Sequence, residues 1–236
     1  STVDKSTGQP LSPFYPPNPV LLRRVRELWQ NEAGLIGDEA ARRMPLPDLP
    51  TWQKTHRFEP KAVSVPSVIP QAYLSYEMAR SACENAGKRL CSKPEWLRAC
   101  KGESQNRFPY GENFIRSRCN IHRLHHPAFV LHGDSSVGHT DPRLNLIVEA
   151  PGDPLLRLTG ATPGCASTWH GDAIFDMVGN LDEWVDDQRG VFVGGFYARA
   201  TTQGCLAEIS SHAEIYYDYS TGTRCCKTLA PDSGAR

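Results

Sequence analysis

A turn-rich stretch between residues 176 and 183 carries the side chains best suited to bind an ion. Asp176 and Glu183 supply two carboxylates, and the backbone carbonyls of Gly179 and Leu181 lie between them. Calcium in proteins takes about six to eight oxygen ligands of these two kinds in a flexible cage. The pattern therefore predicts a calcium site at these four residues. The alternative is a capped turn in which Glu183 accepts hydrogen bonds from backbone amides.

Eight cysteines form a second group of side chains with possible chemistry. No two of them have the C-x-x-C spacing, which disfavours zinc ribbons and thioredoxin-type redox motifs. Their even number favours disulfides over reduced, buried thiols, and disulfides imply an oxidising compartment rather than the reducing cytosol. That compartment would be the periplasm, the cell surface, the secretory route or the thylakoid lumen. Neighbouring strand residues point to opposite faces, so adjacent Cys225 and Cys226 should bond to different partners.

The bulk composition narrows the class of protein. The chain has 236 residues, of which 39% are hydrophobic, and this suits one large domain or one domain with an extension. Basic and acidic residues balance at 26 each, so nucleic acid is not an expected partner. No apolar run approaches the roughly 20 residues of a membrane helix, and no signal segment is visible at Ser1.

Residues 1–53 are expected to form a proline-rich arm ahead of a main domain that covers residues 54–236. Asn18-Pro19 has the residue types of an N-cap and a first helical position, and the residues that follow have one apolar and one cationic face. A second helical piece is expected from Asp38 to Arg43. The arm either packs on its own domain or docks on a protein partner in a larger assembly, and the sequence favours neither.

Two further helices can be placed from their caps. Ser75 should cap a helix that ends before Gly87, which suits the left-handed residue after a helix. Ser92 and Glu95 have the spacing of a capping box at the start of another helix. The polar stretch 119–165 carries five histidines and is expected to be held by metal ions, disulfides or a partner, because such long loops are rare in compact domains.

The order of several motifs resembles the formylglycine-generating enzyme, or sulfatase-modifying factor, family over about residues 55–228. The resemblance implies an α+β fold of the variant C-type lectin kind, disulfide-rich and low in regular secondary structure. The motifs are Gly87-Lys88-Arg89-Leu90, Glu95-Trp96, Phe108-Pro109-Tyr110-Gly111, Asp176 to Trp184 and Thr221-Gly222-Thr223-Arg224-Cys225.

Active members of that family use two cysteines downstream of a Gly-Gly-Ser to bind Cu(I), an ion that soft thiolates suit. Here Phe196 follows the two glycines, Arg199 falls at the first cysteine position and Gly204 at the second, with Cys205 one residue further on. A lone thiol cannot build a two-thiolate site, so no copper is expected. The resemblance also offers the three-histidine iron site of sulfoxide synthases, but His122, His125 and His126 do not have its spacing.

The resemblance carries further expectations about ions and disulfides. It implies that the segment from Asp176 to Glu183 binds calcium, and it places a second calcium ion at Asn120 and Ile121, with Asp134 as a possible further ligand. It pairs Cys100 with Cys225, and Cys119 with Cys205 is a plausible second pair. Partners for the other four cysteines stay open, because connectivity does not follow from sequence alone.

Three functions are compatible with these features. The first is a non-catalytic module of this family that acts as a structural or interaction subunit in an oxidising compartment. The second is a divergent metal oxidase of the same family. The third is a lectin-like binder of a glycan or peptide that uses the loops between Gly194 and Tyr217.

Overall fold

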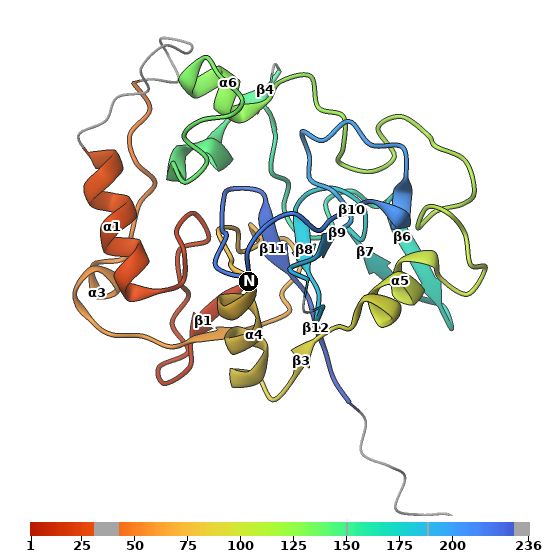
Figure 1. The fold of residues 1–236 in the computed structure, drawn as a ribbon, viewed down its shortest axis with the longest axis horizontal. Helices are drawn as coiled ribbons and strands as arrows, with labels where there is room; N and C mark the ends of the chain where they lie inside the picture. Colours follow the sequence, from red (N-terminus) through yellow and green to blue (C-terminus); the bar gives the residue numbers. More distant parts are fainter. Residues whose placement is uncertain (31–42, 150, 188, 229–236) are drawn as a thin grey trace, which may run out of the picture.

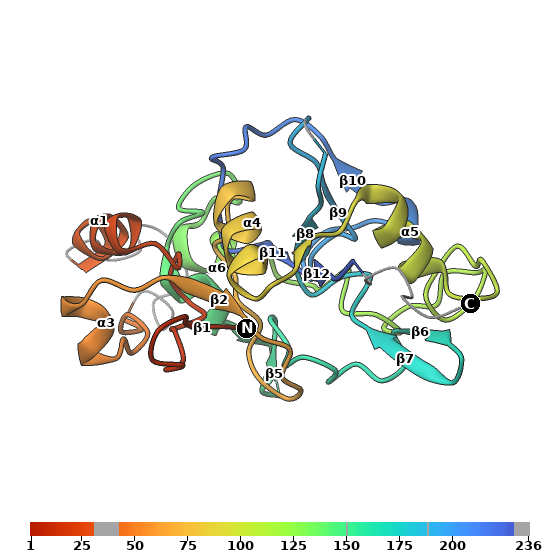
Figure 2. The same cartoon turned by 90° about the horizontal axis from the view of Figure 1, so that it is seen from below.

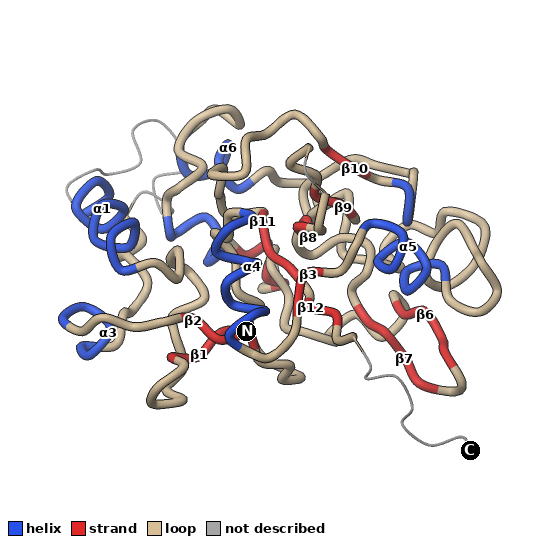
Figure 3. Tube along the Cα trace, turned by 60° about the horizontal axis from the view of Figure 1, so that its bottom comes forward, coloured by secondary structure: helices blue, strands red, loops and turns tan. Residues whose placement is uncertain are grey.

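The computed structural model describes residues 1–30, 43–149, 151–187 and 189–228. Short helices and strands are joined by long ordered loops (Figure 3), which confirms the expected α+β, disulfide-rich fold. The helices are α1 (Pro19–Gln30), α3 (Thr51–Thr55), α4 (Tyr76–Asn85), α5 (Lys93–Lys101), α6 (Pro127–His132) and the 3-10 helices η1 (Pro142–Leu146) and η2 (Gly204–Leu206). The strands are β1 (Thr2–Asp4), β2 (Pro60–Ala62), β3 (Arg89–Leu90), β4 (Val148–Glu149), β5 (Asp153–Pro154), β6 (Ala166–Trp169), β7 (Asp172–Phe175), β8 (Asp182–Trp184), β9 (Phe192–Val193), β10 (Glu208–Ile209), β11 (Thr221–Thr223) and β12 (Cys225–Cys226).

A four-stranded sheet in the order β10-β9-β8-β11 lies at the centre of the molecule (Figure 1). β8 and β11 pair in parallel, whereas the other two pairs are antiparallel. All three residues of β8 are buried, and Trp184 at its end is among the largest fully buried side chains. The Asp182 and Glu183 side chains therefore start from the most enclosed strand of the fold.

The helix caps predicted from sequence are confirmed. Ser75 accepts a hydrogen bond from the Met78 amide at the start of α4, and Ser92 and Glu95 form the complete capping box of α5. In the same way, Asn18 Oδ1 accepts from the amides of the second and third residues of α1. Each of these caps is local, which explains why the sequence is sufficient to place the helix starts.

The N-terminal residues pack on the main domain. β1 pairs antiparallel with β2, so hydrogen bonds cross the expected boundary between residues 53 and 54. Gln71 Nε2 donates to the Tyr15 carbonyl, and Trp29 Nε1 donates to Thr140 Oγ1. Figure 2 shows α1 and α3 at one end of the molecule, with α5 and the β6–β7 hairpin at the other. The helix expected from residue 38 lies almost wholly outside the described residues.

The long loop 119–165 is held by a disulfide between its two ends and by buried charges along its length. Asp141 is fully buried and forms an ion pair with Arg143 at 2.6 Å, and His132 Nε2 lies 3.2 Å from the same carboxylate. Burial alone would raise the pKa of Asp141, but hydrogen bonds from these two side chains outweigh it and lower the pKa. Of the three means expected to hold this loop, metal ions, disulfides or a partner, the structure shows a disulfide.

Candidate functional site

Four disulfides take up all eight cysteines, which suits an oxidising compartment. The pairs are Cys83–Cys225, Cys91–Cys226, Cys100–Cys205 and Cys119–Cys165. The prediction that the adjacent cysteines of β12 bond to different partners is confirmed.

Both disulfides expected from the resemblance, Cys100–Cys225 and Cys119–Cys205, are wrong. β12 pairs antiparallel with β3, and Cys225 bonds there to Cys83 near the end of α4. Cys100 at the end of α5 instead faces η2, where it bonds to Cys205. Cys119 then bonds across the base of its own loop to Cys165. These contacts arise between elements far apart in the sequence, so the cysteine spacing alone does not reveal them.

The segment from residue 176 to 183 forms a tight turn that packs against residue 120. Asp176 and Asn180 both have positive φ angles, +56° and +65°, and Gly179 has a φ of +81°. A Cβ atom on Gly179 would lie 2.3 Å from the Asn120 carbonyl oxygen, so only glycine fits there. The two segments expected to bind calcium are therefore in direct contact, and the Asn180 amide donates to the Asn120 carbonyl at 3.0 Å.

Glu183 is bound by side chains rather than by the backbone amides of a simple capped turn. Trp96 Nε1 donates to its Oε2 at 2.6 Å, and Arg224 forms a bidentate ion pair with it at 2.6 and 2.7 Å. The same guanidinium donates to the carbonyls of Phe175 and Asp176. Burial by itself would lower the pKa of Arg224, but the charge and hydrogen bonds of Glu183 outweigh it and raise the pKa.

A cavity of about 700 Å³ opens beside this turn, and Asp176, Glu183 and Arg224 line it together with Trp96. Asp176 Oδ2 accepts a hydrogen bond from the Gly160 amide, and burial raises the pKa of the Asp176 carboxyl. Lys88 lines the cavity as well, so two cationic side chains stand beside the two carboxylates. The carboxylate donors suit calcium, although Glu183 would have to share its oxygens with Arg224, and calcium at this turn stays a prediction.

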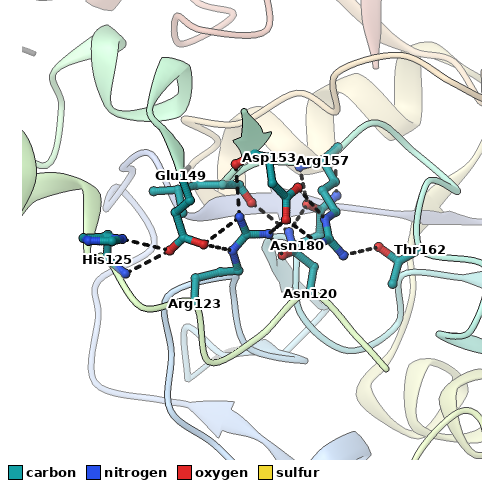
Figure 4. A network of polar contacts seen from close by, with 9 residues as sticks. Asn120, Arg123, His125, Glu149, Asp153, Arg157, Thr162 and Asn180 are labelled. Carbon is teal, nitrogen blue, oxygen red and sulfur yellow. Dashed lines mark hydrogen bonds and ion pairs between the residues drawn. The ribbon is translucent and has the colours of Figure 1, made fainter. Parts of the chain in front are cut away.

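The oxygen atoms around Asn120 that could bind a calcium ion already have other partners. The side-chain Nδ2 of Asn120 donates to the Leu155 carbonyl and to Asn180, while Oδ1 accepts from Arg123 at 3.4 Å. The carboxylates nearby are Glu149 and Asp153, and both are paired with arginine (Figure 4). Asp134, expected as a further ligand, accepts hydrogen bonds from Ser136 in its own turn. Apart from the i+4 spacing of Asp153 and Arg157, the sequence gives no signal of this network.

The residues at the expected copper positions have other partners. Arg199 forms a two-pronged ion pair with Asp182 on β8, at 3.1 and 2.7 Å. A Cβ atom at residue 204 would lie 2.4 Å from the Arg107 carbonyl oxygen, and Gly204 has a φ of +61°. A cysteine therefore does not fit at position 204 in this backbone. Cys205 is bonded to Cys100.

Asp182 is the most perturbed carboxyl of this region. It is fully buried, and burial raises its pKa to about 7 even though the Arg199 guanidinium lowers it. Desolvation therefore outweighs the ion pair, as expected for a carboxylate in the interior of a sheet. The sequence pattern points to Glu183 as an ion ligand and gives no signal for Asp182.

The three histidines that were compared with the iron site, His122, His125 and His126, contact three different partners. His122 Nε2 contacts the Thr201 carbonyl at 2.7 Å, His125 Nδ1 contacts Glu149, and His126 Nε2 lies 3.0 Å from the Tyr219 hydroxyl. Burial lowers the pKa of His126. Among the described residues, no group of three histidine, cysteine or acidic side chains is placed to hold a metal ion.

A groove of about 550 Å³ lies between the arm and the loops near the C-terminus. Aromatic rings line it, from Trp29 on α1 and from Tyr216 and Tyr217. His139 and Thr140 add polar groups to the wall. The sequence predicts core and surface packing for these tyrosines, and it gives no sign that Trp29 of the arm lies beside them. None of the helices in the described residues has the length and apolar character needed to cross a membrane.

Comparison with known proteins agrees with the fold. A family model for the sulfatase-modifying factor enzyme 1-like domain matches residues 48–229. The formylglycine-generating enzyme of Bos taurus is 31% identical over 119 residues, which are 50% of this chain and 27% of the bovine protein. The aligned region thus spans about a quarter of that relative. From the extent of the family match, the chain belongs to the sulfatase-modifying factor enzyme 1-like family.

Proposed function

We propose that this chain is a non-catalytic module of its family, exported to an oxidising compartment, which acts as a structural or interaction subunit of a larger assembly. The observation that carries the proposal is the ion pair between Arg199 and Asp182. The resemblance places the first copper thiolate at residue 199. A guanidinium stands there instead, and it partly compensates a buried carboxylate.

The second thiolate position supports the same proposal. Gly204 has no room for a side chain beside the Arg107 carbonyl, and the neighbouring Cys205 is tied to Cys100. Opening that disulfide would release the thiols of Cys100 and Cys205, but neither of them stands at residue 199 or 204, where the resemblance places the two soft sulfur ligands of Cu(I). The chain thus keeps the family scaffold without the donors for that chemistry.

A competition titration with Cu(I) tests the proposal. The unreduced protein is mixed with Cu(I) and a chromophoric Cu(I) chelator, and the Cys100→Ser, Cys205→Ser double variant serves as the control for non-specific uptake. We expect the wild type to withdraw no more copper than this variant. One Cu(I) per chain that is lost in the variant would instead support a divergent metal oxidase.

The interaction role draws support from the outer face of α1. Leu22 and Val25 point into the protein, whereas Val20 and Leu28 are 64% and 49% exposed. Arg23, Arg24 and Arg26 lie on the same helix. A face that combines exposed apolar and cationic groups suits a protein partner with an acidic rim. The arm thus packs on its own domain and still presents a surface for docking.

The proposal includes one calcium ion, at the turn between Asp176 and Glu183. There the cavity gives an ion access, and Asp176 supplies a buried carboxylate whose Oδ2 accepts a single backbone hydrogen bond, from the Gly160 amide. The ion would stabilise the turn that carries β8. No step of chemistry is assigned to it.

The aromatic groove favours a second candidate function, the binding of a glycan or an uncharged peptide. Trp29, Tyr216 and Tyr217 present ring faces, and His139 and Thr140 present hydrogen-bonding groups beside them. Such a mixture of aromatic walls and few polar groups is typical of ligand sites. A glycan array read by tryptophan fluorescence, with Trp29→Phe as the silent control, would test this candidate.

A further inference from the structure

We propose that two arginine side chains, Arg123 and Arg157, take the place of the calcium ion expected at Asn120, so that this half of the domain is assembled without a metal. The proposal is independent of whether the protein is catalytic. It rests on the hydrogen bonds and charges drawn in Figure 4.

The first step concerns the oxygen atoms of Asn120, which is 1% exposed. Its backbone carbonyl accepts from the Asn180 amide at 3.0 Å, and its side-chain Oδ1 accepts from Arg123. Its amide nitrogen points to the Leu155 carbonyl at 2.8 Å. Arg123 therefore takes up the side-chain oxygen of Asn120, the atom with which this residue would bind a calcium ion.

The second step concerns the carboxylates. Arg123 lies between Glu149 and Asp153, with 2.8 Å contacts to each, and its side chain is only 8% exposed. Arg157 reaches Asp153 from the other side at 2.8 Å. Hydrogen bonds from Arg157 lower the pKa of Asp153. Burial alone would raise the pKa of Glu149, but hydrogen bonds from His125 and the charge of the Arg123 guanidinium outweigh burial and lower this pKa.

The third step is the charge balance. Two carboxylates face two guanidinium groups, so the four charges of the cluster sum to zero. A divalent ion placed in this neutral cluster would lie against two fixed positive charges and gain little net attraction. Calcium sites draw their affinity from the number of charged oxygen ligands, and here those charges are already compensated.

The two arginines also connect the chain segments that a bound ion would hold together. Arg123 joins β4 at Glu149 to β5 at Asp153 and donates to the Asp153 carbonyl as well. Arg157 extends the cluster to Thr162 near the end of the loop. Together with the Cys119–Cys165 disulfide, these contacts hold the two ends and the middle of the loop to the turn at Asn180.

The experiment counts calcium ions bound per chain, by equilibrium dialysis against CaCl2 followed by metal analysis, in the wild type, Arg123→Gln and Asp153→Asn. The glutamine keeps much of the arginine stem and removes the charge. Arg189→Gln is the matched control, because the exposed Arg189 side chain forms an ion pair with Asp187, which is not part of this cluster.

We expect Arg123→Gln to bind one calcium ion more than the wild type, with its Tm raised by about 5–10 °C at 100 times the Kd. Asp153→Asn and Arg189→Gln should bind as many ions as the wild type. Loss of one ion on Asp153→Asn would overturn the proposal, since it would place calcium in the native cluster. A folded Arg123→Gln variant with no extra ion would overturn it as well. Calcium at Asp176 changes the count in all four proteins equally and leaves the comparison intact.

Discussion

Replacing Arg199 by methionine should destabilise the protein in a pH-dependent way. The change removes the only cation paired with Asp182 among the described residues, and Asp182 is fully buried. Removing one partner of a buried ion pair lowers the free energy of unfolding by about 3–5 kcal/mol. Because the Arg199 side chain is 23% exposed, we expect the low end, about 3 kcal/mol at pH 8. That corresponds to a fall in Tm of about 6–12 °C for a domain of this size.

The direction of the pH effect follows from the pKa of Asp182, which burial raises from 3.8 to about 7. Between these two pH values the Asp182 carboxyl holds a proton in the folded state and has released it in the unfolded state. The contribution of Asp182 to the stability of the protein therefore falls as the pH rises through this window. At pH 5 the folded carboxyl is neutral, and Arg199→Met should cost only about 1 kcal/mol, the value of a lost hydrogen bond. Above pH 7 the variant must hold an uncompensated charge or bind a proton.

Urea unfolding at pH 5 and pH 8, with the disulfides intact, measures both numbers. The Asp182→Asn, Arg199→Met double variant is the control, because it removes the charge together with its partner and should recover most of the loss at pH 8. An equal loss at the two pH values, or a larger loss at pH 5, would refute the assignment of Asp182 as a buried, pH-sensitive carboxyl.

Two further predictions test the backbone around the expected copper positions and the disulfide pattern. Gly204→Ala should destabilise the protein by more than about 2 kcal/mol, because its Cβ would lie 2.4 Å from the Arg107 carbonyl oxygen. The control is Gly8→Ala, at a similar φ of +73° with open space around it, which should cost about 1 kcal/mol. Equal losses of stability in urea unfolding would contradict the steric argument. Non-reducing peptide mapping should recover the four disulfides described above, whereas a peptide that joins Cys100 to Cys225 would restore the pairing expected from sequence.

The features that sequence predicts well here are those set by neighbouring residues. Ser75, Ser92 and Asn18 each cap a helix through an amide two or three residues away, so residue type and spacing suffice. The same holds for Cys225 and Cys226, whose opposite faces follow from strand geometry. The family motifs placed the fold because they mark several such local structures in a fixed order.

The partners of the charged side chains could not be predicted, because they come from remote segments. Glu183 meets Trp96 and Arg224, and each of these lies more than forty residues away along the chain. Asp153 has a visible partner at i+4 in Arg157, but nothing in the sequence points to Arg123. The disulfide pairing failed for the same reason, since it depends on how α4 and α5 pack against β12 and η2.

The most direct test of the central claim, that this domain keeps its family's scaffold without a thiolate pair for copper, is a thiol count. The unreduced protein is denatured, treated with iodoacetamide and weighed by intact mass spectrometry. The account predicts no alkylated cysteine, because all eight are in disulfides. Two alkylated cysteines, one of them Cys205, would contradict it.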